Sequence, residues 1–272
     1  MQYAALIWRI SIVLIGANAA IACENNYSSE SVPVDGRAAH EFSVEQVLQR
    51  NLERVRTKPS GTKTENTDKI LHINEADYSL VARYRAAADG FMRIDVFDGA
   101  NRVFSEGIDE LGIWQWPGDK AAPENVSHAG AEALKHSIEF NLFTLAELSD
   151  RGHSIEIDGR ETILDKPYIV LKLTLSDGFE TYRFVNTETW LVDISRDFRA
   201  FHPAVDSTKK NIETRYDQWS QADGVLFASR VRNIDLDSGE VIATTLVLES
   251  SDNRPREALD LPRSYVPTGA PR

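Results

Sequence analysis

The sequence predicts an α+β protein in which a wide antiparallel β-sheet curls into a cup with helices across its mouth. Three observations lead to this fold class. Blocks of alternating hydrophobicity, typical of strands, lie on either side of a block with helical spacing. Asp-Gly pairs separate several of the expected strands, which favours tight antiparallel hairpins. Finally, roughly eleven or twelve strands are too many for one flat sheet, so the sheet should curl.

The first helix is expected directly after residue 42. Ser43 is followed three residues later by Gln46, which is the pattern of a capping box. Phe42 and Val47 are spaced as a hydrophobic staple across that cap. Apolar residues then recur at helical spacing up to Val55, before a Pro-Ser-Gly stretch ends the pattern.

The remaining elements follow as meander, helices, meander. Strands are expected near residues 66–74, 78–87, 90–97, 101–108 and 111–116. Residues 123–150 have helical spacing, and Thr144 and Glu147 form a second capping-box pattern before a short helix. Further strands are expected near residues 153–158, 167–176, 179–186, 189–196, 211–219, 225–234 and 240–249.

The charge of the chain excludes one class of partner. The 272 residues carry a formal net charge of −12, and their Lys and Arg residues form no basic run. Nucleic-acid binding needs clustered cations, so it is not expected. An acidic protein also gains no general attraction to anionic membrane surfaces.

Residues 1–22 have the pattern of a secretory signal peptide. Arg9 and the amino terminus precede an apolar run that ends in small residues. A buried N-terminal helix or a membrane anchor is the alternative, although the run is short for a span of about 20 residues. The pattern predicts that the protein works outside the cytoplasm.

Cys23 is the only cysteine, so no disulfide within the chain is possible. The preceding residues, "AIA", resemble a bacterial lipobox, which would put a lipid anchor on Cys23. Ordinary cleavage after Ala19 or Ala22 remains the alternative. We expect a flexible leader over 23–40, a single domain over 41–262 and a tail over 263–272, with a monomeric chain.

The expected helices are too small to cover the expected sheet. Strands of ~17 Å at ~4.8 Å spacing give a sheet face of roughly 1,000 Å². Two helices of about 13 residues cover roughly 400 Å². The sheet either closes on itself into a fully packed core, which is the rule for proteins, or leaves an apolar cavity for a ligand.

The hairpin around Asp177-Gly178 indicates which side chains would face such a core or cavity. A two-residue turn there would pair Leu173 with Tyr182 and Leu171 with Phe184. These four side chains would then share the inner face. The opposite face, expected to meet water, would carry Lys172, Thr174, Thr181 and Arg183.

Several motifs resemble the LolA/LolB-like family of periplasmic lipoprotein carriers. They include "IEIDGRETILDKPYIVLKLTLSDGFETYRFVNTETWLVDIS" from Ile155 to Ser195, with its Asp-Gly turn and Asn-x-x-Thr corner at Asn186. "RYDQWSQADGVLFASRV" and "GIDELGIWQWPGD" fit two further segments, although Ala228 stands where the family often has proline. The likeness extends over about residues 43–249.

The resemblance implies an open antiparallel half-barrel with helices in its mouth, and an apolar cavity that holds lipid or the acyl chains of a lipoprotein. It implies no cofactor and no catalysis. The family's functional arginines are not assigned, although Arg83, Arg85 and Arg93 lie in the matching half. The residues expected to line the cavity wall are Leu171, Leu173, Tyr182, Phe184, Met92, Ile94, Val96, Leu48 and Leu52.

Two other functions stay open. The same half-barrel could dock a protein partner, as an envelope sensor or assembly subunit. An exported hydrolase would need a carboxylate pair or a Ser-His cluster formed by tertiary contact. No nucleophile, phosphate-loop or dinucleotide motif occurs, and the six histidines are too dispersed to indicate a metal site.

Overall fold

The computed structural model describes residues 42–56, 65–203 and 206–254. The helices are α2 (Val44–Val55), α3 (His128–Leu142) and α4 (Leu145–Asp150). The strands are β1 (Asn66–Glu75), β2 (Tyr78–Ala87), β3 (Met92–Asp98), β4 (Asn101–Asp109), β5 (Gly112–Pro117), β6 (Glu124–Asn125), β7 (Ser154–Ile163), β8 (Lys166–Thr174), β9 (Glu180–Asn186), β10 (Val192–His202), β11 (Asp206–Ala222), β12 (Val225–Asp235) and β13 (Val241–Asp252).

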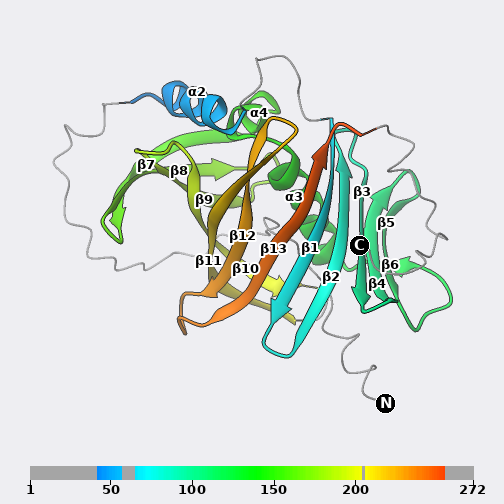
Figure 1. Ribbon diagram of the computed structural model, residues 1–272. Helices are drawn as coiled ribbons and strands as arrows, with labels where there is room; N and C mark the ends of the chain where they lie inside the picture. The colour runs from blue at the N-terminus through cyan, green and yellow to red at the C-terminus, as the bar shows by residue number, and fades with distance from the viewer. Residues whose placement is uncertain (1–41, 57–64, 204–205, 255–272) are drawn as a thin grey trace.

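The described strands form one 13-stranded sheet in the order β6-β5-β4-β3-β2-β1-β13-β12-β11-β10-β9-β8-β7. Neighbouring strands are consecutive in the chain, except where β1 pairs with β13, which is also an antiparallel pairing. The two edge strands, β6 and β7, do not pair with each other, so the sheet remains open. Figure 1 shows it curling around the helices. The predicted open half-barrel is therefore confirmed, with one strand more than expected.

The helices pack against the inner face of the sheet in two places. α3 lies on the β1–β4 half and shares with it the α3 cluster, whose buried members include Leu71, Ile94 and Leu134. α2 and α4 lie over β7–β9 and form the α2–α4 cluster, with Leu148 and Leu171 among its buried members. The middle of the sheet, from β11 to β13, lies between these two clusters (Figure 1).

Both predicted capping boxes are present. The Ser43 hydroxyl accepts a hydrogen bond from the backbone N–H of Gln46, whose side chain accepts one from the backbone N–H of Ser43. Thr144 and Glu147 make the same reciprocal pair at the start of α4. Reciprocal caps satisfy amide groups that a helix start leaves unpaired, so these two motifs fix where α2 and α4 begin.

The predicted register of the β8–β9 hairpin is wrong by one residue. Leu175 N–H donates to Phe179 O, so the loop has three residues, and Gly178 at its end has φ +90°. A three-residue loop of this kind closes on a glycine in the left-handed region, whereas a two-residue turn was expected. Leu171 therefore faces Arg183, and Leu173 faces Thr181.

A shift of one residue moves every side chain of a strand to the other face. Tyr182 and Phe184 accordingly pack with Tyr168 and Val170 on the outer face of the sheet. Arg183, expected in water, is only 6% exposed and lies on the inner face. The register shift therefore places a cation on the inner face of the sheet.

Several expectations lie outside the described residues. They are the signal peptide over 1–22, the leader over 23–40, the lipid on Cys23 and the tail over 263–272. No helix within the described ranges is both long and apolar enough to cross a membrane.

Candidate binding cavity

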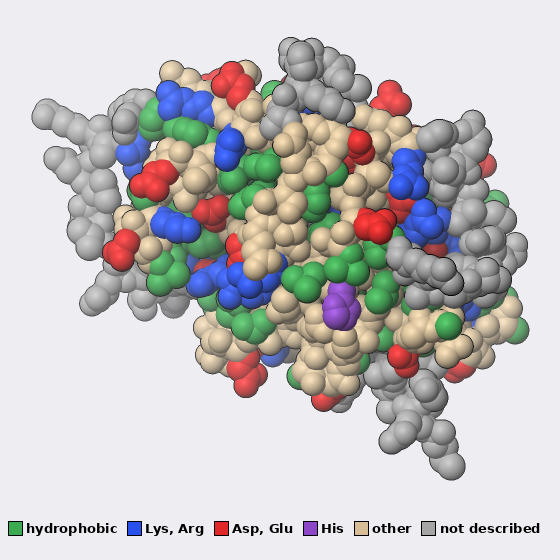
Figure 2. Space-filling view, in the orientation of Figure 1, with side chains coloured by type: hydrophobic (Ala, Val, Ile, Leu, Met, Phe, Trp, Pro, Cys, Tyr) green, Lys and Arg blue, Asp and Glu red, His purple; other side chains and the backbone are tan. Residues whose placement is uncertain are grey.

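A cavity of about 230 Å³ opens on the inner face of the sheet between the α3 cluster and the α2–α4 cluster. Its walls come from the central strands β1, β11, β12 and β13, from the junction of α3 and α4, and from the last turns of α2. The helices thus cover the two ends of the sheet and leave its middle accessible. The face of the molecule seen in Figure 2 mixes apolar side chains with charges of both signs.

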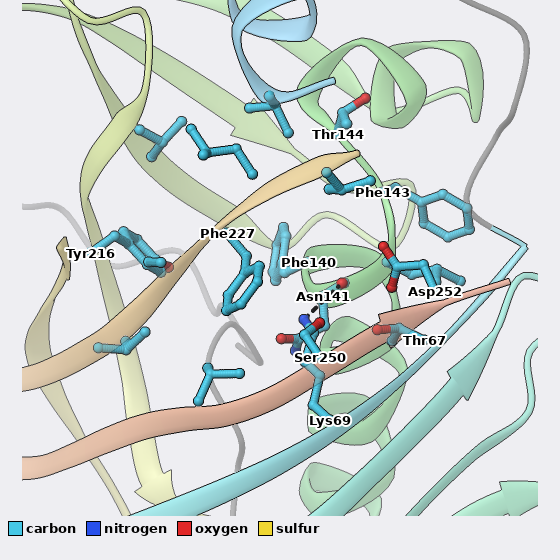
Figure 3. A pocket seen from close by; sticks show the side chains of 18 of the residues that line it. Thr67, Lys69, Phe140, Asn141, Phe143, Thr144, Tyr216, Phe227, Ser250 and Asp252 are labelled. Carbon is cyan, nitrogen blue, oxygen red and sulfur yellow. Dashed lines mark hydrogen bonds between the residues drawn. The ribbon is translucent and has the colours of Figure 1, made fainter. Parts of the chain in front are cut away.

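Most of the lining is apolar. Phe227 and Val231 of β12 and Val247 of β13 form part of the sheet side, and Phe140 of α3 faces the same space. In Figure 3, Phe227 and Phe140 lie in the middle of the cavity, between Tyr216 at one end and Asp252 at the other. A cavity with polar groups at both ends and aromatic rings between them suits an elongated ligand with an apolar body.

One end carries an ionisable pair. Lys69 of β1 donates to the backbone O of Asn141 at 3.4 Å. Burial lowers the pKa of Lys69, against the opposing influence of Asp252. Burial likewise raises the pKa of Asp252, against Lys69 and Thr67. Because the two opposite charges act on each other, this end is close to electrically balanced.

The other end carries Arg183 of β9. Its Nη1 donates to the hydroxyl of Tyr216 at 3.1 Å, and its guanidinium lies 4.4 Å from the ring centroid of Phe140. The Tyr216 hydroxyl is also 3.2 Å from Ser195 Oγ. Among the described residues, Nη2 of Arg183 is buried without a hydrogen-bond partner.

The residues predicted to line the cavity wall lie elsewhere. Three of them, Met92, Ile94 and Val96, are fully buried in the α3 cluster. Leu48, Leu171 and Leu173 are buried in the α2–α4 cluster, and Leu52 of α2 is half-buried. None of these seven, and neither of the outer-face aromatics Tyr182 and Phe184, is part of the cavity lining. The predicted inner face is right for Leu171 and Leu173, but they support the helices instead of the cavity.

Sequence reasoning predicted the central strands β11–β13 but did not assign their side chains to the cavity lining. "VLFASRV" of β12, which contributes Phe227 and Val231, carries a visible apolar signal. Lys69 and Arg183 carry no such signal, because a cation in an alternating strand is by default assigned to solvent.

The three arginines of the matching half, Arg83, Arg85 and Arg93, also lie outside the cavity lining. Arg83 pairs with Asp68, and Arg85 and Arg93 both pair with Asp95. The Arg83 and Arg85 pairs join neighbouring strands, and the Arg93 pair lies within β3. All three guanidinium groups therefore already have a carboxylate partner in the sheet, outside the cavity lining.

Several described histidines occur in separate places with separate carboxylate contacts. His136 contacts Asp177, His153 contacts Glu139, and His202 contacts Glu75, so these three contacts do not converge on one site. Within residues 42–56, 65–203 and 206–254, no group of three or more His, Cys, Asp or Glu side chains could hold a metal ion. The cavity is therefore characterised by its apolar surface and its three charged groups, Lys69, Arg183 and Asp252.

No protein-family model and no curated protein matches the chain by sequence. Solved structures do match. A LolA superfamily protein from Nitrosomonas europaea aligns with a TM-score of 0.53 and 17% identity, covering 81% of this chain and 98% of that protein. A DUF1329 family protein from Desulfovibrio piger aligns with a TM-score of 0.48 and 10% identity, covering 80% and 99%.

A putative outer membrane lipoprotein-sorting protein domain from Vibrio parahaemolyticus aligns with a TM-score of 0.48 and 9% identity, covering 77% of this chain and 92% of that domain. At such identities a likeness concerns the fold and not the activity. The fold of this chain, an open antiparallel half-barrel around a few helices, is LolA-like.

Proposed function

We propose that this protein is a non-catalytic lipid carrier of the periplasm, which holds the acyl chain of a lipid or lipoprotein in the central cavity. The observation that carries the proposal is the mainly apolar cavity left between the two core clusters, over the middle of the sheet. The LolA-like fold supports it, and so does the export pattern of residues 1–22.

The physical basis is the removal of hydrocarbon from water. Each buried methylene group is worth ~0.8 kcal/mol, so an acyl chain binds without needing many polar contacts. The cavity volume lies just below the ~300–1,000 Å³ typical of small-molecule sites, which suits part of one chain better than several chains.

The test uses a neutral fluorescent probe, N-phenyl-1-naphthylamine, with the full-length protein. Phe227 is a half-buried residue in the middle of the cavity, and Tyr182 is a half-buried aromatic on the outer face. Phe227→Glu places a charge against the guest and should weaken probe binding about tenfold or more, because an isolated charge resists transfer to an apolar site. The matched control Tyr182→Glu should bind as the wild type does.

Native mass spectrometry of the purified protein provides a second measurement. We expect lipid to remain bound to the wild type and to be depleted from Phe227→Glu. A wild type that binds neither the probe nor any extractable lipid would rule out the carrier function, and would favour a surface that docks a protein partner.

The hydrolase alternative receives no geometric support from the Ser-His contact on the β1–β2 hairpin. His72 Nε2 is 2.7 Å from Ser79 Oγ, but that hydroxyl donates its own proton to Asn74 Oδ1 at 2.8 Å. A nucleophilic serine must instead donate to the histidine. Ser79 is also exposed, outside the cavity.

A further inference from the structure

Arg183 is a buried cation in the wall of an apolar cavity, and the described part of the chain offers it no carboxylate. Its contacts are the Tyr216 hydroxyl and the ring of Phe140, both neutral. A guanidinium keeps its charge inside proteins and has five N–H donors in a planar fork. With Nη2 unpartnered and the side chain 6% exposed, this fork has unused donors next to the cavity.

The nearby carboxylates already have partners. Asp197, on the same face of the sheet as Arg183, accepts hydrogen bonds from Arg199 Nε at 3.1 Å and from Thr181 Oγ1 at 3.1 Å. At the far end of the cavity, Asp252 is balanced by Lys69. The described lining of the cavity therefore contains one positive charge in excess, and that charge is on Arg183.

An uncompensated buried charge is among the most unfavourable features a fold can contain. It is tolerated where a ligand supplies the counter-charge, because hydrogen bonds between a guanidinium and an oxyanion are about twice as strong as neutral ones. The position of Arg183 also matters. It lies beside Tyr216, at the end of the cavity opposite Asp252 and beyond the apolar middle formed by Phe227 and Phe140.

We infer that the cavity selects an amphiphile with a single chain and an oxyanion head, and that Arg183 holds the head while the chain lies along Phe227 and Val231. This inference rests on the proposed carrier function and specifies its ligand class. Tyr216 is a positioning residue, because its hydroxyl accepts from Nη1 and directs the fork. A neutral lipid would occupy the same apolar surface but would leave Arg183 uncompensated.

Calorimetric titration at pH 8 with decanoate and decan-1-ol tests the inference, since these ligands share chain length and differ in head charge. We expect the wild type to bind decanoate about 10- to 100-fold more tightly than decanol. Arg183→Gln should abolish that preference and leave decanol affinity within about twofold. Tyr216→Phe should weaken decanoate binding several-fold. Decyl phosphate, run in parallel, distinguishes a phosphate head from a carboxylate by which ligand binds more tightly.

Arg196→Gln is the matched control. Arg196 is the neighbouring arginine of β10, lies on the outer face opposite Tyr182, and pairs with Glu213 and Glu161. The Arg196→Gln variant should keep the wild-type preference for decanoate over decanol. The ligand-free melting temperature provides a separate readout: Arg183→Gln should hold or raise it, because the substitution removes an unmatched buried charge.

The outcomes separate the inference from the proposed function. Equal binding of decanoate and decanol by the wild type would overturn the inference and leave the carrier function intact. A preference that survives in Arg183→Gln would overturn it as well. A large fall in melting temperature of Arg183→Gln, together with loss of both ligands, would make Arg183 a structural residue. Failure of the wild type to bind either ligand would count against the carrier function itself.

Discussion

Glu106 of β4 is a carboxyl group placed in the apolar side of the sheet. It lies on the same face of β4 as Phe104 and Ile108, which pack in the α3 cluster, and it is 5% exposed. Within the described ranges its Oε1 has no hydrogen-bond partner. Burial raises the pKa of Glu106 to about 8, so the neutral acid is the stable form in the folded protein at neutral pH.

Glu106 should make the protein less stable as pH rises. Its pKa is higher in the folded state than in the unfolded chain, so the folded state binds more protons between about pH 4.5 and pH 8. The stabilisation is complete below that range and is lost as pH rises through about 8. Between about pH 5.5 and 8.5, the wild type should lose about 3 kcal/mol more unfolding free energy than Glu106→Gln.

Urea unfolding of both proteins at the two pH values measures this difference. Glu110→Gln, which changes an exposed glutamate one residue beyond the same strand, is the control and should follow the wild type. Identical pH dependence of wild type and Glu106→Gln would show that Glu106 titrates normally.

At the scale of elements, the β8–β9 hairpin shows how far sequence reasoning reaches. The Asp-Gly pair correctly locates the turn, and the alternation correctly identifies both strands. The loop length is not encoded by these two residues, because Asp-Gly fits both two-residue and three-residue loops. One residue of loop length decides whether Arg183 or Tyr182 points inward, so the face of β9 could not be predicted.

The same hairpin makes a prediction about Gly178. Its φ of +90° is unfavourable for any residue with a Cβ, although no atom lies within 4 Å of where that Cβ would be. Gly178→Ala should therefore lower the unfolding free energy by about 1 kcal/mol through backbone strain alone.

Gly159 of β7 is the matched control. It also has open space around its missing Cβ, but its φ is outside the left-handed region. Gly159→Ala should be neutral or stabilise by about 0.4–1 kcal/mol, because alanine reduces the entropy of the unfolded chain. Equal effects of the two substitutions in denaturant unfolding would contradict the assigned turn.

At the scale of the whole molecule, the core is divided. The α3 cluster and the α2–α4 cluster share one packed neighbour within the described ranges, Phe143, at the junction of α3 and α4. The sequence indicates that the helices are too small to cover the whole sheet. The core is divided because the helices cover two separate parts of the sheet and leave a region between them uncovered. Where the uncovered region falls depends on how the helices distribute over the sheet, which no local pattern specifies.

The division predicts how core substitutions combine. Leu148 and Ile169 belong to the α2–α4 cluster, and Ile94 belongs to the α3 cluster. Leu148→Ala combined with Ile94→Val should be additive in unfolding free energy to within about 0.3–0.5 kcal/mol. Leu148→Ala combined with Ile169→Val should deviate by about 0.5 kcal/mol or more, because the residues share a cluster. Coupling of equal size in both pairs would indicate a single continuous core.

The pairing of β1 with β13 has a consequence for the order of events in folding. It joins Thr67 to Asp252, the longest sequence separation in the described sheet, and closing so long a loop is slow. Both strands contribute lining residues, so the cavity does not exist while the last strand is still missing. The buried members of both core clusters precede residue 186, whereas part of the cavity wall comes from β13, so a chain made from its amino terminus assembles the cavity last. A chain that ends before β13 therefore lacks an assembled cavity.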